Sequence, residues 1–329
     1  MNVIKFSIVV PFYNAECFLE ETILSILNCN YKKIEIILID DGSSDSSYDI
    51  CLSFREKYAN TEFILLKQCN SGPNVARNLG IDHATGDFVL FIDADDLLDS
   101  KCFETLLPYV HDYKYDYICY GIDFFDNGNN RTLSKKTPKL IEYDNPRVIK
   151  EAFGNNELLG VCWNKCISLR FLNLRNIRFE PDKMHGRDIL FSRSCAVISN
   201  RVLSINNVLC HSRYHVASFS RSFGKANIIS AIDLAEKHFD LFEKYVDRIV
   251  IESSISKHFN YILLLSSFRS LSYQDFRINH EMIKTAKGDL RISNCESNIK
   301  QKLLTAYLKF PSAAWIISKT LNALGYKPY

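Results

Sequence analysis

Short apolar runs alternate with amphipathic segments along the first third of the chain. The apolar runs are rich in β-branched residues, which is typical of strands buried on both faces. They lie at Phe6–Val10, Glu35–Asp40, Phe63–Leu66 and Phe88–Asp93, and Pro11 is expected to end the first. Helices are predicted between them at Glu16–Leu27, about 46–58 and Asn74–Ala84. This alternation predicts an α/β fold with a doubly wound, mostly parallel sheet.

The middle of the chain is less regular, and its last third has a helical pattern. Strands are predicted at Asp116–Phe124 and Arg201–Val208, a polar turn or hairpin at Asp126–Lys139, and partial helix at Glu151–Phe171. From about Lys225, apolar residues recur at the spacing of one helical face: Ala231, Leu234, Ala235, Phe239, Phe242 and Val246. A boundary near Phe223 therefore separates an α/β domain (residues 1–223) from a helical C-terminal region (residues 224–329).

Composition narrows the class of protein. Of the 329 residues, 47% are hydrophobic and 24% charged, a balance typical of soluble globular proteins. A net charge of +2 without a basic block argues against nucleic acid as a partner. The 11 cysteines are scattered, and the pair Cys162 and Cys166 is not followed by a second pair with zinc-ligand spacing. Reduced thiols are therefore expected.

Targeting and membrane-spanning patterns are not evident in the sequence. The chain enters its first predicted strand without the basic and apolar regions of a signal peptide. The longest apolar stretch, near Tyr261–Leu265, is too short to cross a bilayer. We therefore expect a cytoplasmic protein.

Candidate chemistry gathers where the predicted strands end. Ligands of doubly wound sheets bind outside the carboxyl ends of the strands. Four polar segments occupy those positions: Phe12–Asn14, Asp40–Ser43, Asn70–Arg77 and Asp93–Asp96. A single polar loop, or a single Asp that caps a helix, would carry little information. Four together predict a ligand that offers a base, a ribose, phosphates and a cation.

The last of these segments predicts a metal site. If the backbone stays extended past Ile92, Asp93 and Asp95 point to one side and Asp96 to the other. Paired carboxylates favour a hard divalent cation, Mg²⁺ or Mn²⁺, which completes its shell with water and phosphate. The alternative is that these acids only cap a helix that begins near Ser100.

These segments resemble one known family. The sequences SIVVPFYN from Ser7, IDDGSSD from Ile39, ARNxG from Ala76 and FIDADD from Phe91 are similar to family 2 glycosyltransferases. The resemblance is strong over roughly residues 5–100, weaker to about 222, and does not cover the remainder. It implies the GT-A fold, a nucleotide-sugar donor and inversion at the anomeric carbon.

The resemblance also implies roles for individual residues on the donor side. It implies a nucleotide-sugar site made by Pro11, Tyr13, Asn14, Asp41, Arg77 and Asp93, in which the Asp41 carboxylate can accept the uracil N3–H. This favours a UDP-sugar. Asp95, with Asp93, would hold the metal. The alternatives are that Pro11 ends a strand, Tyr13 packs in the protein, and Arg77 pairs with Asp87.

The base expected for an inverting transfer matches Asp188. The family usually has Glu before this Asp, whereas this chain has Arg187. Arg187 would either lower the pKa of Asp188 or point away, to a phosphate or an acidic acceptor. The alternatives for Asp188 are a helix N-cap role, or replacement as base by Asp182 or Glu180.

A later segment resembles the family's flexible cover over the donor. His215 and Ser218 match its polar positions, and the imidazole of His215 would ligate the metal or hydrogen-bond the diphosphate. Arg213, like Arg221, would neutralise phosphate charge; the nearby His211 is a competing candidate. Trp163 would either stack on an acceptor sugar or fill the core.

The function that follows is a metal-assisted glycosyltransferase. We expect it to extend a lipid-linked cell-envelope glycan, such as an O-antigen or capsule. The closing segment 310–329 would contact the inner face of the plasma membrane, pack on the catalytic domain or form a homo-oligomer. The alternatives are a non-catalytic nucleotide-sugar-binding protein and a polyprenyl-phosphate glycosyltransferase. A nicotinamide dehydrogenase is disfavoured because no G-x-G-x-x-G follows the first strand.

Overall fold

The structure is a computed structural model that describes residues 3–128, 131–153, 161–182, 184, 186–214, 225–270, 272–292 and 309–323. The chain forms two compact units. The first comprises Met1–Lys183 and Arg187–His215, and the second comprises Met184–Gly186 and Val216–Tyr329. The predicted boundary at residue 223 lies outside the described residues, and it stays a prediction.

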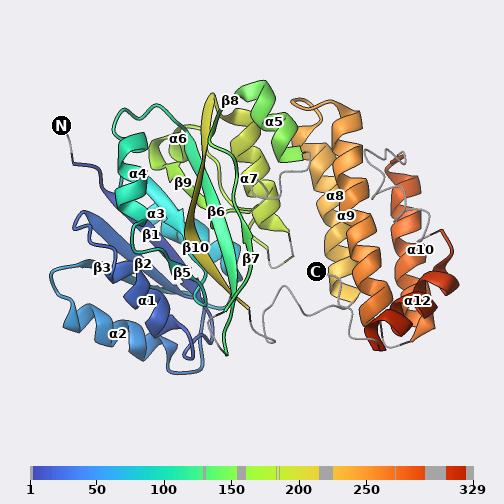
Figure 1. Cartoon of the computed structure of the whole chain (residues 1–329), viewed down its shortest axis with the longest axis horizontal. Helices are drawn as coiled ribbons and strands as arrows, with labels where there is room; N and C mark the ends of the chain where they lie inside the picture. Colours follow the sequence, from blue (N-terminus) through green and yellow to red (C-terminus); the bar gives the residue numbers. More distant parts are fainter. Residues whose placement is uncertain are drawn as a thin grey trace. The chain divides into compact units, whose positions relative to one another are not determined.

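One mixed sheet organises the first unit (Figure 1). Its order is β3-β2-β1-β4-β9-β6-β10-β5, with β7 paired to β6 and β8 to β10. The strands are β1 (Phe6–Phe12), β2 (Ile34–Asp40), β3 (Glu62–Lys67), β4 (Phe88–Phe91), β5 (Leu97–Leu98), β6 (Tyr117–Asp126), β7 (Thr132–Lys136), β8 (Ile141–Asp144), β9 (Lys165–Ser168) and β10 (Arg201–Tyr214). The helices of this unit are α1 (Leu19–Leu27), α2 (Ser47–Lys57), α3 (Pro73–His83), α4 (Cys102–Val110), α5 (Asn145–Phe153), α6 (Leu169–Leu174) and α7 (Arg187–Ile198).

The first four strands confirm the predicted parallel pairing, and three of them, β1, β2 and β4, are fully buried, whereas β3 is not. β1 pairs in parallel with β2 and with β4, and β2 pairs in parallel with β3. Every residue of β1, β2 and β4 is buried, so these runs carry no polar alternation. Parallel strands aligned in this way bring their carboxyl ends to one edge of the sheet, which assembles the polar segments predicted from the sequence.

Pro11 does not end β1, contrary to the expectation. The strand continues through Pro11, which lies opposite Ile39, to Phe12. The strand tolerates proline here because β4 ends opposite Val9, so β1 has only β2 as a partner at this point. A proline that needs no N–H for the ladder can remain inside a strand.

The segment Glu151–Phe171, predicted as helical in part, contains a strand that the pattern did not indicate. β9 lies between β4 and β6 and is antiparallel to both. Its four residues, KCIS, are all buried. A strand of this length shows no period of its own, and its pairing with two distant strands decides its conformation. The predicted hairpin is confirmed, because β7 pairs antiparallel with β6.

The backbone of α3 lies close to side chains of β1 and β2 at Gly80. α3 packs against β1 and β2, and Gly80 faces Val9 there. A Cβ atom at Gly80 would overlap the Val9 side chain and come within 3.2 Å of Ile39 Cδ1. The helix that carries Arg77 is therefore held closely against the strands that end at the polar edge.

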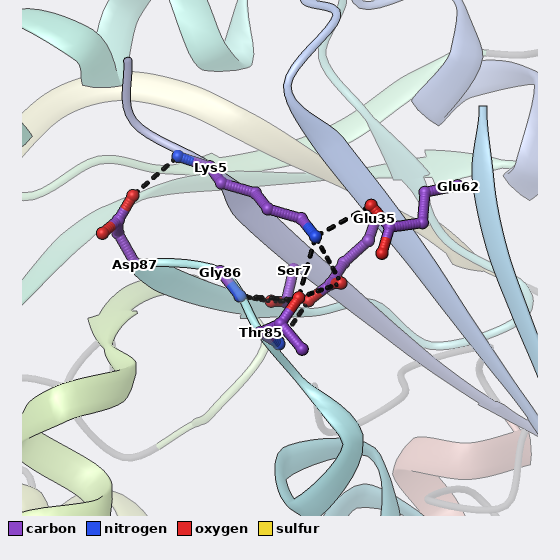
Figure 2. A network of polar contacts seen from close by, with 7 residues as sticks. All are labelled: Lys5, Ser7, Glu35, Glu62, Thr85, Gly86 and Asp87. Carbon is purple, nitrogen blue, oxygen red and sulfur yellow. Dashed lines mark hydrogen bonds and ion pairs between the residues drawn. The ribbon is translucent and has the colours of Figure 1, made fainter. Parts of the chain in front are cut away.

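A buried polar network occupies the opposite, amino-terminal edge of the same strands (Figure 2). Glu35, at the start of β2, accepts hydrogen bonds from Ser7 Oγ at 2.5 Å, Thr85 N at 2.6 Å and Thr85 Oγ1 at 2.7 Å. Gly86 N adds a bond at 3.1 Å, and Lys5 Nζ lies 2.9 Å from Glu35 Oε2. Burial alone would raise the pKa of Glu35, but these donors outweigh it and lower the pKa to about 2.

Helices build the second unit: α8 (Lys225–Phe242), α9 (Arg248–Arg269), α10 (Tyr273–Asp289) and α12 (Pro311–Ala323). The predicted apolar face of α8 is buried, as Ala231, Leu234 and Phe239 show. Lys319 of α12 donates to the carbonyls of Phe268 and Ser270, which ties α12 to the end of α9. Among the described residues, no helix is long and apolar enough to cross a membrane.

Candidate active site

The Asp93–Asp96 turn follows β4 at the carboxyl edge of the sheet. Its backbone is closed by a hydrogen bond from Asp96 N to Asp93 O at 3.0 Å. Asp96 is 4% exposed, and its Oδ1 accepts from the backbone N–H of Arg213 at 2.9 Å. Asp93 and Asp95 are partly exposed. The turn therefore keeps one acid in the protein interior and leaves two accessible.

Negative charge accumulates in this turn. The pKa of Asp96 lies well above its ordinary value, first because of burial and then because of the charges of Asp95 and Asp93. The contribution of Asp95 and Asp93 to this pKa shift, second to that of burial, reflects carboxyl groups that lie close enough to repel one another. The turn therefore offers oxygen ligands where a cation is electrostatically favoured.

Arg77 of α3 connects the turn to the rest of the edge. Its Nη2 donates to Asp93 Oδ1 at 2.6 Å and its Nη1 to Asn74 Oδ1 at 3.2 Å. The guanidinium carbon lies 5.5 Å from the centroid of the Phe179 ring. The alternative partner, Asp87, instead accepts from Lys5 N and Tyr113 Oη at the other edge. Arg77 thus belongs to the site.

Asp188 lies in the first turn of α7, within electrostatic reach of Arg77 and Asp93. Burial raises its pKa, Arg77 opposes that shift, and Asp93 adds to it. A carboxylate with a raised pKa is a stronger base than an ordinary aspartate. Asp188 therefore has the environment that a general base needs.

Arg187 adopts neither of the two predicted positions. Its Nε lies 2.8 Å from both carboxylate oxygens of Asp182, and its Nη2 lies 2.7 Å from Asp182 Oδ2. The Arg187 side chain is fully buried in this pair. The pKa of Asp188 is raised rather than lowered, because burial is the largest influence on it and Arg187 is paired with Asp182. The negative charge of Asp182, the alternative base, is balanced by Arg187 in the same ion pair.

Asp41, the carboxylate predicted to bind the nucleobase, is 4% exposed. Its Oδ1 accepts from Gln68 Nε2 at 2.8 Å and Ser71 N at 2.7 Å, and its Oδ2 accepts from Gly72 N at 2.8 Å. The carboxylate thus holds the loop that leads into α3, and Oδ2 retains acceptor capacity. Gly72 adopts φ 96°, a conformation that favours glycine.

Two loops at this edge are joined by reciprocal hydrogen bonds around Asn14. Asn14 N donates to Ser43 Oγ at 3.0 Å, and Asn14 Oδ1 accepts from Ser44 N at 2.8 Å. Asn14 itself has φ 48°, a left-handed conformation that asparagine tolerates. The preceding Tyr13 is 51% exposed, whereas Pro11 is buried in β1. The structure therefore leaves the Tyr13 ring accessible and uses Asn14 to fix the loop.

The remaining predicted residues lie in different settings. Arg213 is 5% exposed and forms an ion pair with Glu21 at 2.6 Å. Trp163 is half-buried, with its ring centroid 6.5 Å from that of Phe124. The competing candidate His211 is held between Asp123 at 2.7 Å and Asp99 at 3.3 Å. His215, Ser218 and Arg221 lie outside the described residues.

The chemistry of Asp93 and Asp95 fits a hard divalent cation. Carboxylate oxygens are the preferred ligands of Mg²⁺ and Mn²⁺, and both side chains are partly exposed beside the buried Asp96. Within the described ranges, no group of three or more His, Cys, Asp or Glu side chains is arranged to hold a metal. A site with one or two protein carboxylates is the kind that relies on water and substrate phosphates for its other ligands.

Several residues of the site escaped the sequence analysis. Gln68 follows β3 directly, and its place beside the predicted polar loops was the signal that could have found it. Phe179 contacts Arg77, and its ring stacks on Phe191 of α7 at 3.8 Å. These aromatic contacts join segments more than ten residues apart, and no local pattern reveals them.

Comparison with known proteins agrees with this geometry. The family described as Glycosyl transferase family 2 matches residues 7–177. GlyA of Streptococcus pneumoniae is 27% identical over 72% of this chain and 34% of its own length. The minor teichoic acid biosynthesis protein GgaB of Bacillus subtilis is 31% identical over 56% of this chain and 20% of its own length. The chain thus spans 34% and 20% of the length of these two relatives.

Solved structures share the fold. Residues 1–349 of TarS of S. aureus, crystallised with UDP-GlcNAc, match with a TM-score of 0.69 at 18% identity, covering 99% of this chain and 93% of that 1–349 chain. The mannosyltransferase PcManGT of Pyrobaculum calidifontis, in complex with GDP-Man and Mn²⁺, matches with a TM-score of 0.55 at 16% identity, covering 98% and 88%. At these identities the likeness establishes the GT-A type of fold.

The fold and its acidic edge define a glycosyltransferase. The match over residues 7–177 covers more than half of the chain, and the chain belongs to glycosyl transferase family 2. The predicted family and enzyme class are confirmed.

Proposed function

We propose that this glycosyltransferase moves a sugar from a UDP-sugar to a hydroxyl of a growing cell-envelope glycan, with inversion. The observation that carries the proposal is the grouping of Asp188, Arg77 and Asp93 at the carboxyl edge, where the pKa of Asp188 responds to both neighbours. TarS, a structural neighbour, binds UDP-GlcNAc, and GgaB is a teichoic acid biosynthesis protein. The TarS complex supports a nucleotide-sugar donor, and GgaB supports an envelope glycan as acceptor.

The donor site in this proposal uses the loops after β1, β2 and β3. Tyr13, which is 51% exposed, offers a ring face to the base, and Asp41 Oδ2 accepts its N–H. Pro11 and Asn14 hold the first loop, and Arg77 directs positive charge to this edge.

Asp188 removes the proton from the acceptor hydroxyl as its oxygen attacks the anomeric carbon. Inversion follows from a single displacement in which base and leaving group lie on opposite faces of the sugar. Asp95, with Asp93, would hold Mn²⁺ or Mg²⁺, which supplies stabilisation for negative charge on the leaving diphosphate. His215 remains a proposed further ligand outside the described residues. Trp163 would contact the acceptor sugar.

The alternative of a non-catalytic binder loses its motivation. It would follow if Arg187, in place of the family's usual Glu, left the chain without a base, whereas Arg187 pairs with Asp182. The pKa of Asp188 is raised, as a base requires.

We also propose that α12 brings the enzyme to the inner face of the plasma membrane, where a lipid-linked acceptor would lie. Ile316 and Ile317 of α12 are 59% and 46% exposed, and Phe310, which precedes the helix and follows Lys309, is 68% exposed. An apolar helical face beside a cation is typical of interfacial helices. In this proposal residues 1–223 bind the donor and carry the catalytic residues, and residues 224–329 contact the acceptor, the membrane surface or a second copy.

A binding screen tests the donor assignment. Purified protein is titrated with UDP-, GDP- and dTDP-sugars, with and without Mn²⁺, by calorimetry. We expect one UDP-sugar to bind at least about tenfold more tightly than its GDP and dTDP counterparts, a difference of about 1.4 kcal/mol. Preference for GDP or dTDP would contradict the UDP assignment, and absence of binding to every nucleotide sugar would contradict the proposed function.

A further inference from the structure

Arg213, at the end of β10, joins three elements through its side chain, which is 3% exposed. Its Nε donates to the backbone carbonyl of Asp95 at 2.9 Å. Its Nη1 donates to Asn127 Oδ1 at 2.5 Å, just after β6, and its Nη2 to Glu21 Oε2 at 2.6 Å on α1. Each guanidinium nitrogen therefore has a partner on a different segment.

Two aromatic rings fix the plane of the same guanidinium. Its central carbon lies 5.1 Å from the ring centroid of Phe18 and 4.9 Å from that of Phe125. A planar guanidinium that stacks on rings and donates along fixed directions has little freedom left. The guanidinium that donates to the Asp95 carbonyl is therefore held in place by two further hydrogen bonds and two aromatic rings.

The main chain of Arg213 holds the other half of the turn. Its N–H donates to Asp96 Oδ1 at 2.9 Å, while its side chain holds the Asp95 carbonyl. One residue thus fixes two consecutive positions of the Asp93–Asp96 turn. Glu21, at 2.6 Å, supplies the countercharge within the protein.

We propose that Arg213 is a positioning residue that holds the Asp93–Asp96 turn in its working geometry without contacting the donor. This inference rests on the proposed function of that turn and replaces the expectation that Arg213 neutralises phosphate charge. All three nitrogens of the guanidinium are directed at Asp95, Asn127 and Glu21. A displacement of about 1 Å in such a turn is enough to cost about a hundredfold in rate.

Two variants test the role from both sides of the ion pair. Arg213→Lys keeps a positive charge but loses the fork of donors, and Glu21→Ala leaves Arg213 intact while removing its countercharge. Arg248→Lys is the matched control, because Arg248 also donates to three partners, Glu252, Glu243 and Leu290 O, within the second unit. Circular dichroism establishes that each variant is folded.

Hydrogen exchange of the backbone amides at residues 93–98 is the readout that needs no activity. We expect both site variants to exchange about tenfold faster there, the factor that loss of one hydrogen bond to a charged group predicts. Arg248→Lys is expected to leave these amides unchanged. Unchanged exchange in Arg213→Lys and Glu21→Ala would overturn the proposal.

Kinetics and nucleotide binding separate positioning from donor contact. In Arg213→Lys we expect kcat for donor hydrolysis to fall about a hundredfold, while the Kd for UDP without metal changes less than about threefold. A tenfold weaker Kd with normal exchange would show that Arg213 binds the diphosphate, and would overturn the proposal. If wild-type protein binds no nucleotide, the proposed function fails, while the exchange experiment still decides whether Arg213 fixes the turn.

Discussion

Buried acids at the two ends of the parallel strands β1–β4 have pKa values that are shifted in opposite directions. At the amino ends, Glu35 receives donors from Ser7, Thr85 and Gly86, and its pKa falls to about 2 (Figure 2). At the carboxyl ends, Asp96 and Asp188 have raised pKa values. At the amino edge hydrogen-bond donors outweigh the burial of Glu35, whereas at the carboxyl edge the burial of Asp96 and Asp188 prevails.

The basic residues repeat this difference. Lys5 at the amino edge lies 2.9 Å from Glu35 and 2.8 Å from Glu62, so its charge is met twice. Arg77 at the carboxyl edge is 7% exposed, and its Nε has no hydrogen-bond partner among the described residues. A buried donor without a partner costs stability. We therefore expect substitutions at the amino edge to change stability, and substitutions at the carboxyl edge to change catalysis.

The largest expected effect is at the carboxyl edge. Asp188→Asn removes the proposed base and is expected to lower the transfer rate by a factor of about 10² to 10⁴. Because the amide has the same shape, the Kd for the UDP-sugar should change less than about threefold. Initial rates and calorimetry measure both. A larger rate loss in Asp182→Asn than in Asp188→Asn would show that the base has been misassigned.

The matched substitution at the amino edge is Glu35→Gln. The folded pKa of Glu35, about 2, lies below its ordinary value of 4.5, so its ionisation stabilises the fold above pH 4.5 and stops doing so as pH falls toward 2. At neutral pH the variant should lose about 2 to 3 kcal/mol of unfolding free energy. Urea unfolding at several pH values measures this, with the difference from wild type shrinking at acid pH.

Activity provides the control for Glu35→Gln. The rate per folded molecule should match wild type, because Glu35 lies at the opposite edge from Asp188. A tenfold rate loss without a change in stability would erase the distinction between the two edges.

A smaller effect is expected at Gly72, in the loop that leads from the carboxyl edge of the sheet into α3. Gly72→Ala places a Cβ at φ 96° and should cost about 1 kcal/mol of stability. It should also weaken donor binding, because Gly72 N holds Asp41 Oδ2. Gly288→Ala in α10 is the control, since a Cβ there meets no atom within 4 Å, and it should stabilise the helix by about 0.5 to 1 kcal/mol. Thermal unfolding and calorimetry compare the two variants.

The smallest effect should come from Lys5→Met. The Lys5 side chain is 27% exposed, so water screens its ion pairs with Glu35 and Glu62. A loss of about 0.5 to 1 kcal/mol in urea unfolding is expected, well below that of Glu35→Gln. An equal loss in both variants would mean that Lys5, rather than the hydrogen bonds from Ser7, Thr85 and Gly86, stabilises Glu35.

The sequence predicted the parts of the fold that depend on local pattern. The apolar runs of β1, β2 and β4 mark strands buried on both faces, and parallel pairing brings Asp41 and Asp93 to one edge. β9 could not be predicted, because four residues carry no period and antiparallel contacts with β4 and β6 decide their conformation.

The sequence indicated where the acids of the proposed site lie, but not which side chains they contact. Asp93, Asp95 and Asp188 follow from strand ends and from the family resemblance. The pairing of Arg187 with Asp182 depends on the direction of one side chain, which the sequence leaves open. The contacts of Arg213 with Glu21 and Asn127 join segments far apart in the chain, so only the folded structure reveals its setting.

The proposed role of the Asp93–Asp96 turn is to hold a cation that binds the donor. Calorimetric titration of wild type and Asp95→Ala with UDP, with and without Mn²⁺, tests it most directly, with Glu35→Gln as the control at the other edge. We expect Mn²⁺ to tighten UDP binding at least about tenfold in wild type and Glu35→Gln, and to change the Kd of Asp95→Ala less than about twofold. Equal tightening by Mn²⁺ in Asp95→Ala would contradict the account.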